Sequence, residues 1–215
     1  MENNKLTKAI AAFITAVKKL GFEIHKVLCK FGARYRASRW LKNNYLILDT
    51  ETTGLGKDAE IIEMCIIDCT GKVLLNTLVK PRNPIPAEAT AIHGITNEMV
   101  AASPTWRDIH WQFMAIIHTK TLVIYNIDFD VRLIMQTAEI NKCGFGYLEL
   151  NAECAMHNYA EYYGQWDEKR NKFKWQSLSN AAKQQGVVID GTPHRALADC
   201  KTTLGVIRAM AGVKS

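Results

Sequence analysis

The sequence predicts an α/β domain, with a mixed β-sheet flanked by helices, that follows a basic helical arm. The chain has 215 residues, of which 48% are hydrophobic and 22% are charged, so it is long enough to bury one ordinary core. In residues 44–215, three strand-like segments come first, and strand and helix patterns then alternate, which is typical of a mixed sheet. Residues 1–43 differ from this body in charge and in periodicity, so we treat them as a separate arm.

The arm carries most of the excess positive charge. Residues 1–44 contain ten Lys and Arg against two Glu, whereas the rest of the chain contains 17 basic and 19 acidic side chains. Apolar residues recur in the arm at alternating spacings of four and three, like the a and d positions of a heptad repeat. They are Leu6, Ile10, Phe13, Val17, Leu20, Ile24, Val27 and Phe31. Two lysines before Gly21 resemble a helix stop, so one kinked helix and a two-helix hairpin both fit the pattern.

The arm fits several kinds of partner. Its apolar stripe is suited to packing on the chain's own domain, to self-association, to docking on a protein partner or to lying on a membrane surface. Its Lys and Arg favour a polyanion such as nucleic acid. All of these readings remain open at the level of the sequence.

The body begins with a three-strand meander. Residues 45–48 form a short apolar run, and residues 61–67 and 73–79 flank the turn signal Asp68-Cys69-Thr70-Gly71. A proline-rich loop over residues 81–86 follows. The remaining segments are a helix over 106–117, a strand over 121–125, a helix from about 129, a helix around 178–182 that closes at Gly186, and a last helix over 196–210.

Composition also limits the cellular setting. The longest apolar stretch near the start, residues 9–17, is too short to span a bilayer and leads into two lysines rather than into a signal-peptide cleavage site. The six cysteines include no C-x-x-C pair, so we expect reduced thiols and no zinc site. We therefore expect a cytoplasmic protein that is not an integral membrane protein.

The first chemically suggestive motif lies where the first strand ends. The sequence there is Asp49-Thr50-Glu51-Thr52-Thr53-Gly54. Residues i and i+2 of a strand point to the same side, so Asp49 and Glu51 project together. Paired carboxylates suit a hard cation such as Mg²⁺, although two solvated loop carboxylates would give the same pattern.

Two further acidic motifs follow. Asp128 and Asp130 stand after the strand over 121–125, where either could be a metal ligand or only a helix cap. His194 and Asp199 are five residues apart, and in one helix they would point about 140° away from each other. Pro193 favours a helix that starts near this point, so His194 can precede the helix while Asp199 points inward from it.

Together these motifs fit two-metal hydrolysis of a phosphodiester. Four carboxylates from three segments could hold two cations about 3.5–4 Å apart, which would clamp the attacking and the leaving oxygen. A histidine, with an unperturbed pKa near 6.5, is suited to take a proton from the attacking water at neutral pH.

The combination resembles the DEDDh (DnaQ-like) 3′–5′ exonucleases, a family that includes the proofreading epsilon subunit of DNA polymerase III and exonuclease X. The resemblance covers residues 44–210. Residues 49–54 look like the first motif, and His194 with Asp199 looks like the third. Asn126 with Phe129-Asp130 looks like the second, which selects Asp130 over Asp128. The segment Ala-Ile-His-Gly-Ile-Thr at 91–96 resembles another segment of this family.

This resemblance implies a ribonuclease H-like fold and two divalent cations, Mg²⁺ or Mn²⁺. Asp49 would bridge both cations, Glu51 and Asp199 would complete one site, Asp130 would hold the other, and His194 would be the general base. The residues implied to bind the terminal nucleotide are Thr52, Gly54, Leu55, His93, Asn126 and Phe129.

The implied activity is release of nucleoside monophosphates from DNA 3′ ends. An exoribonuclease of the same family, or an inert nucleic-acid-binding adaptor, would share much of this pattern. Tyr125 departs from the family, because many members have histidine there. Residues 166–175 mix basic and aromatic side chains, which fits either a contact with the strand or an ordinary exposed loop.

Overall fold

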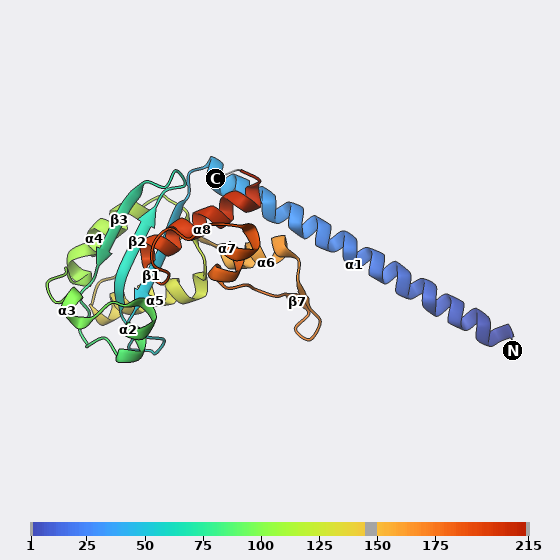
Figure 1. The fold of residues 1–215 in the computed structure, drawn as a ribbon, viewed down its shortest axis with the longest axis horizontal. Coiled ribbons are helices and arrows are strands. Elements are labelled where there is room, and N and C mark those ends of the chain that lie inside the picture. Colours follow the sequence, from blue (N-terminus) through green and yellow to red (C-terminus); the bar gives the residue numbers. More distant parts are fainter. Residues whose placement is uncertain (1, 145–149, 214–215) are drawn as a thin grey trace.

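The computed structural model describes residues 2–144 and 150–213, with side chains from Ile14 onward. A five-stranded mixed sheet forms the centre, with helices on both faces, and one long helix extends away from it (Figure 1). The sheet has the order β3-β2-β1-β4-β5, in which β1 to β3 are antiparallel neighbours while β4 and β5 run parallel to β1. The strands are β1 Leu46–Thr52, β2 Ile61–Ile67, β3 Val73–Leu78, β4 Leu122–Ile124 and β5 Ala152–Cys154.

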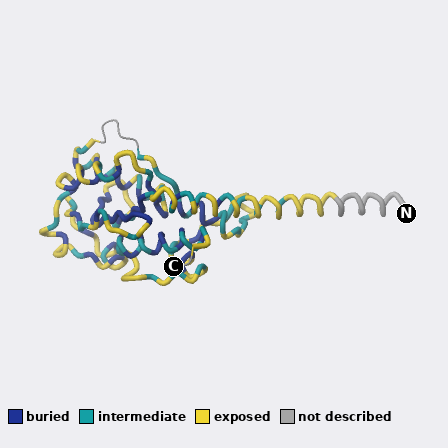
Figure 2. Tube along the Cα trace, turned by 90° about the horizontal axis from the view of Figure 1, so that it is seen from above, coloured by how far each residue is buried: buried dark blue, intermediate teal, exposed yellow. Residues whose placement is uncertain are grey.

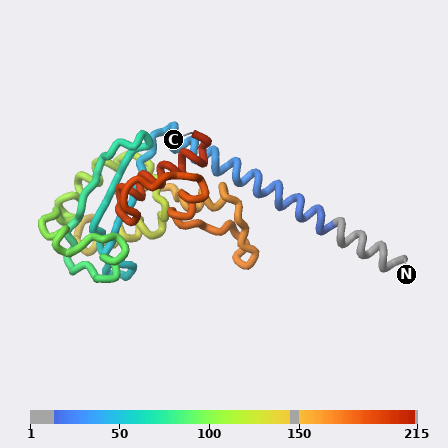
Figure 3. Tube along the Cα trace, viewed as in Figure 1, coloured from blue at the N-terminus to red at the C-terminus, as the bar shows by residue number. Residues whose placement is uncertain are grey.

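The helices follow the chain in the same order as the colours of Figure 3. They are α1 Glu2–Lys42, α2 Ala87–His93, α3 Asn97–Val100, α4 Trp106–Ile117, α5 Ile127–Ile140, α6 Ala155–Tyr163, α7 Leu178–Gln185 and α8 Ala196–Ala211. A small hairpin of β6 Trp166–Asp167 and β7 Lys172–Phe173 completes the described elements. Among the described residues, no helix is both long enough and apolar enough to cross a membrane.

The sheet separates two hydrophobic cores because side chains alternate along each strand. On β1, Ile47 faces the core that the end of α1 forms with α6, α7 and α8, whereas Leu46 and Leu48 face the core under α4 and α5. Both faces of β2 are covered, and all seven of its residues are buried. The sheet is therefore a rigid base for side chains at the ends of β1 and β4.

The arm is one continuous helix rather than a kinked helix or a hairpin. Gly21 lowers helix propensity by only about 1 kcal/mol relative to Ala, and α1 continues through it. The stripe residues from Val17 to Phe31 are exposed. Figure 2 colours most of the described part of the helix that projects from the body as exposed. The stripe positions Leu6, Ile10 and Phe13 lie outside the residues whose side chains are described.

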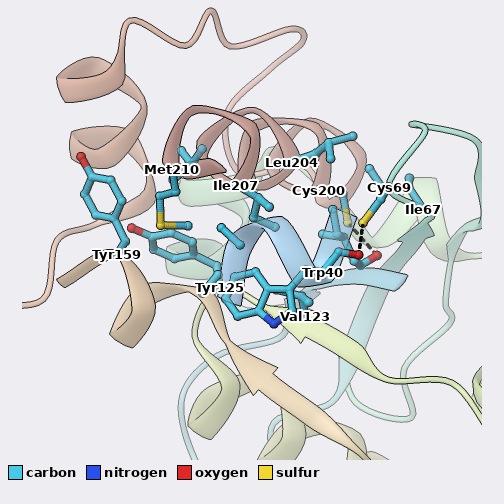
Figure 4. Packing of buried hydrophobic residues seen from close by; sticks show 14 of the residues in the cluster. Trp40, Ile67, Cys69, Val123, Tyr125, Tyr159, Cys200, Leu204, Ile207 and Met210 are labelled. Atoms are coloured by element: carbon cyan, nitrogen blue, oxygen red, sulfur yellow. Dashed lines mark hydrogen bonds between the residues drawn. The ribbon is translucent and has the colours of Figure 1, made fainter. Parts of the chain in front are cut away.

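The last turns of α1 belong to the body's core. Ala33, Ala37 and Trp40 are buried, and Figure 4 shows Trp40 close to Val123 and Cys69. The indole N–H of Trp40 donates a 2.9 Å hydrogen bond to Glu153 of β5. Residues 33–42 therefore pack as part of the domain that follows, although charge and periodicity group them with the arm.

Most sequence-predicted elements are present, with small shifts. Strand β1 continues to Thr52, past the predicted end at 48, so Asp49 and Glu51 lie within the strand. Helix α5 begins at Ile127, two residues early. The sequence analysis missed the short helices α2 and α3, and also β5, α6 and the β6–β7 hairpin. The missed strands have two or three residues each, too few to show a periodicity.

Candidate active site

The five predicted catalytic side chains come from four neighbouring elements. Asp49 and Glu51 lie on β1, Asp130 lies in the first turn of α5, and Asp199 lies in the first turn of α8. His194 lies in the loop that leads into α8. Strands β1 and β4 are parallel neighbours, so the α5 start that follows β4 meets the end of β1. Helix α8 packs on the same strand.

The carboxylates are close enough to influence each other strongly. Burial raises the pKa of Asp49 well above its usual range, and the charges of Asp130, Asp199 and Glu51 raise it further. Burial and the charge of Asp199 raise the pKa of Glu51 to about 8. The pKa of Asp130 is raised to about 7, mainly by burial. A buried cluster of like charges is costly by itself, and a divalent cation among these oxygens would remove that cost.

One triad of potential ligands is already assembled. An oxygen of Glu51, a ring nitrogen of His194 and an oxygen of Asp199 all lie within 4.8 Å of one another. Burial raises the pKa of Asp199, while the His194 ring and backbone amide act in the opposite direction. The two carboxylate oxygens of this triad are hard donors that fit Mg²⁺ or Mn²⁺ well.

Asp130 is held in place by a residue that sequence reasoning did not single out. The hydroxyl of Thr50 donates a 2.8 Å hydrogen bond to the Asp130 carboxylate. Asp130 is only 4% exposed, whereas Asp128 is exposed in the same first turn of α5. This geometry favours Asp130 as the inward-facing ligand. The position of Thr50 between two candidate ligands was the available sequence signal.

His194 is outside the final helix, as the spacing argument required. Helix α8 begins at Ala196, and the His194 backbone has φ +59°, in the left-handed region that non-glycine residues rarely adopt. The His194 side chain is exposed to solvent. A strained residue with an accessible ring beside two carboxylates is typical of a functional site.

A buried ion pair fixes this loop from the opposite side. Glu63 lies on β2 directly across from Glu51, and its side chain is 5% exposed. It accepts hydrogen bonds from Arg195 at 2.7 and 3.1 Å and from the Ala196 backbone N–H at 2.9 Å. Glu63 therefore holds the two residues that follow His194. Sequence reasoning missed it, although a lone acidic residue in the apolar run 61–67 was a visible signal.

A hollow of about 480 Å³ opens beside the carboxylates. Its lining includes five of the six residues predicted to bind a nucleotide, namely Thr52, Gly54, Leu55, His93 and Phe129. Glu51 also lines it, together with Glu88 and Ile92 of α2, which the sequence analysis did not name. Gly54 has φ +152°, which side-chain-bearing residues rarely adopt, and a Cβ there would meet open space. Glycine is therefore favoured at position 54 by the backbone conformation and not by a steric clash.

His93 is a buried member of this lining. Its Nδ1 accepts a 3.0 Å hydrogen bond from the Ile95 backbone N–H, which places the proton of the neutral ring on Nε2. His93 is 4% exposed, and its Nε2 is buried as well. Burial lowers the pKa of His93, which favours this neutral form.

Two predicted features lie outside the hollow. Asn126 is the exposed N-cap residue of α5 and is not part of the lining, so its side chain is not grouped with the other five. Tyr125 is buried, and its hydroxyl donates a 2.9 Å hydrogen bond to the Gln176 carbonyl. Tyr125 therefore stabilises the chain before α7.

Comparisons with known proteins agree with this geometry. Residues 46–207 match the RNase_T exonuclease family model. An uncharacterized exonuclease, CP81, of Escherichia phage 186 is 53% identical over 180 residues, which cover 82% of this chain and 92% of the phage protein. The DNA polymerase III subunit epsilon of Buchnera aphidicola (Schizaphis graminum) is 36% identical over 102 residues, and the match spans only 43% of that protein.

Solved structures share the fold. Exonuclease X in complex with 5′ overhanging duplex DNA has a TM-score of 0.54 and 27% identity, with 79% of this chain and 93% of that chain covered. The nuclease domain of 3′hExo, a DEDDh family member bound to rAMP, has a TM-score of 0.56 at 17% identity, covering 76% and 89%. Both structures support the ribonuclease H-like, mixed-sheet fold. The chain thus belongs to the RNase_T exonuclease family, as a nuclease of the DEDDh, DnaQ-like type.

Proposed function

We propose that this chain is a metal-dependent 3′–5′ exonuclease that releases nucleoside monophosphates from DNA 3′ ends by two-metal hydrolysis. The observation that carries the proposal is the convergence of four carboxylates and one histidine beside a hollow of nucleotide size. The four carboxylates repel one another at this range, and bound divalent cations would offset that repulsion.

The metal ligands would be Asp49, Glu51, Asp130 and Asp199. Their oxygens suit Mg²⁺ or Mn²⁺, and bound cations would offset the burial and the like charges that raise the pKa values of Asp49 and Glu51. When bound, two such cations would stabilise the negative charge that develops on the attacking and leaving oxygens.

His194 would act as the general base. Its ring is exposed, so a water molecule can reach it, and the proton would pass from that water to an imidazole nitrogen. The neighbouring Asp199 carboxylate favours the protonated ring that results, because an opposite charge stabilises the imidazolium. The left-handed backbone of His194, held by the Glu63–Arg195 pair, would keep the ring over the carboxylates.

The hollow would hold the 3′-terminal nucleotide. Phe129 and Leu55 offer apolar surface for the sugar and base, and such contacts tolerate any base. His93, which lines the hollow, would lie against the sugar or base of this nucleotide. The guanidinium of Arg132 lies 5.4 Å from the centre of the Phe129 ring and adds positive charge near this surface.

The relatives with the higher sequence identity favour DNA over RNA as the substrate. Exonuclease X, at 27% identity, was solved with duplex DNA, and the epsilon relatives are subunits of a DNA polymerase. The alternative exoribonuclease has fold-level support from 3′hExo with bound rAMP. An inert adaptor is disfavoured because every catalytic position carries the required side chain.

The test is hydrolysis of 3′- and 5′-labelled DNA and RNA oligonucleotides with Mg²⁺, Mn²⁺ or EDTA. We expect stepwise shortening from the 3′ end of DNA, complete inhibition by EDTA, and no activity in Asp130→Asn. Asp128→Asn is the matched control, because it removes an exposed carboxylate from the same helical turn and should leave activity unchanged. Faster hydrolysis of RNA would select the alternative, and full activity in EDTA would overturn the two-metal mechanism.

A further inference from the structure

The two opposite faces of helix α1 differ in their contacts with the body. One face lies against the body: Phe22 packs edge-on against Trp166 at 5.0 Å, His25 stacks on Phe173 at 6.0 Å, and Ala33 is buried. Two aromatic residues of the stretch 166–175, Trp166 and Phe173, thus contact the arm and have a structural role. This face is accounted for by contacts within the chain.

On the opposite face, the side chains described from Ile14 onward make no such contacts. Val17, Leu20, Ile24, Val27 and Phe31 are 51%, 63%, 52%, 67% and 72% exposed. Residues two apart on a helix point about 200° away from each other, so Val27 and Phe31 lie nearly opposite Cys29 and Ala33. The body cannot cover this stripe without unwinding the helix. Five large apolar side chains in one exposed row mark an interaction surface.

The spacing of the row indicates what covers it. Val17, Ile24 and Phe31 occupy a positions, and Leu20 and Val27 occupy d positions of a strict seven-residue repeat. A straight α-helix drifts about 20° per heptad from such a repeat, so a strict repeat keeps its seam only against another helix in a supercoil. The sequence continues the repeat back to Leu6, giving nearly four heptads.

The flanking positions are compatible with two identical helices side by side. The g positions between Ala16 and Lys30 hold Ala16, Glu23 and Lys30, and the e positions that face them in a parallel pair hold Gly21, Leu28 and Tyr35. No like charges face each other across such a seam. Lys18, Lys19 and Lys26 lie on the b and c positions, away from it. β-Branched residues at a with Leu at d favour two parallel strands, and Val17, Ile24 and Leu20 follow this rule, whereas Val27 and Phe31 do not.

We propose that a second copy of this chain covers the exposed stripe, so that two α1 helices form a parallel coiled coil. The body packs on the opposite side of each helix, so two bodies would splay outward without blocking the seam. The occupant is a copy of this chain rather than nucleic acid, because the basic side chains lie off the stripe. The proposal does not depend on the substrate of the nuclease.

The mass of the full chain in solution, by light scattering after gel filtration, tests the proposal. We expect twice the chain mass of 24.2 kDa for the wild type. The double variant Leu20→Glu/Val27→Glu should give the single-chain mass, because four buried carboxylates would face each other across the seam. Lys18→Gln/Lys19→Gln is the matched control: it makes the same change in net charge off the seam and should keep the doubled mass.

Helix content and hydrolysis of a dinucleotide show whether each variant is folded. A wild type that remains single at all concentrations, or a seam variant that is folded and still doubled, would overturn the proposal. A single wild-type chain that binds vesicles of anionic lipid would assign the stripe to a membrane surface instead. Orientation is tested with Leu20→Cys, which on oxidation should link residue 20 to residue 20 of the second copy; links only between residue 20 and a distant residue would exclude parallel helices.

Discussion

The contact between Glu63 and Arg195 should control turnover without touching substrate. Glu63→Gln keeps the size of the side chain and one acceptor oxygen for the Ala196 N–H. It removes the charge that holds the Arg195 guanidinium at 2.7 Å, and the new amide N–H groups face a donor. We expect the segment 194–196 to shift, and with it the His194 ring and the first turn of α8.

The size of the effect follows from burial. Removing one partner of a buried ion pair costs about 3–5 kcal/mol, but the Arg195 side chain is 34% exposed and can recover water. We therefore expect a loss of about 2–3 kcal/mol in the free energy of unfolding, or roughly 4–12 °C in Tm at this chain length. A displacement of about 1 Å in a catalytic group can lower turnover by roughly 100-fold, so kcat should fall 10- to 100-fold while KM changes little.

The assay compares Glu63→Gln with Glu60→Gln. Glu60 is equally buried, just before β2, and accepts hydrogen bonds from the Arg82 and Asn83 backbone N–H groups, away from His194. Both variants should melt earlier, measured by circular dichroism, but only Glu63→Gln should lose kcat when assayed well below its Tm. Equal losses of kcat in both variants would mean that Glu63 only stabilises the fold. An unchanged kcat in Glu63→Gln would refute the idea that Glu63 positions His194.

Four further predictions follow from the site and the arm. His194→Ala should lower kcat by roughly 10²–10⁴-fold, measured at saturating Mg²⁺; wild-type activity in this variant would make His194 structural. Thr50→Val should lower the apparent affinity of the protein for Mg²⁺ by about 10–100-fold, measured by titrating activity with Mg²⁺, because Asp130 loses its 2.8 Å hydrogen bond. Without metal, Tm should fall as pH rises from about 4 to 8. The pKa values of Asp130 and Glu51 are raised to about 7 and about 8, so in this range the folded state retains protons that the unfolded state releases. Added Mg²⁺ should restore Tm most at the alkaline end, and a pH-independent Tm would contradict this prediction. Deleting residues 2–21 should leave dinucleotide hydrolysis intact, whereas deleting residues 2–42 should destabilise the body by at least about 3–5 kcal/mol in a urea melt, because the Trp40 side chain leaves the core.

Local patterns were enough to predict how three of the four candidate ligands lie. Alternation along a strand put Asp49 and Glu51 on one side, and five-residue spacing put His194 outside the helix of Asp199. These inferences use neighbours in the chain, for which backbone geometry is known in advance. The choice of Asp130 over Asp128 needed the family resemblance, because two residues in one helical turn look alike in sequence.

Contacts between distant segments were not visible in the sequence. Glu63 and Arg195 are 132 positions apart, and Thr50 and Asp130 are 80 apart. Nothing in a single sequence pairs them. The course of α1 was ambiguous for a related reason: Gly21 and its two lysines signal a helix end locally, while the burial of Trp40 at the far end depends on the sheet and on Glu153.

The connection between α1 and the sheet sets a geometric constraint on any assembly. Only three residues separate the end of α1 from β1, and the backbone N–H of each donates a hydrogen bond to a carbonyl near the end of the helix. Asn43 donates to Arg39, Asn44 to Leu41 and Tyr45 to Trp40. Helix α1 is therefore rigidly joined to the sheet, and its whole length is about 60 Å. A partner bound to the projecting part of α1 would therefore fix the direction in which the Asp49 and Glu51 carboxylates face. Two catalytic centres joined through it would work at one set separation and angle, and would select pairs of nucleic acid ends that fit that span.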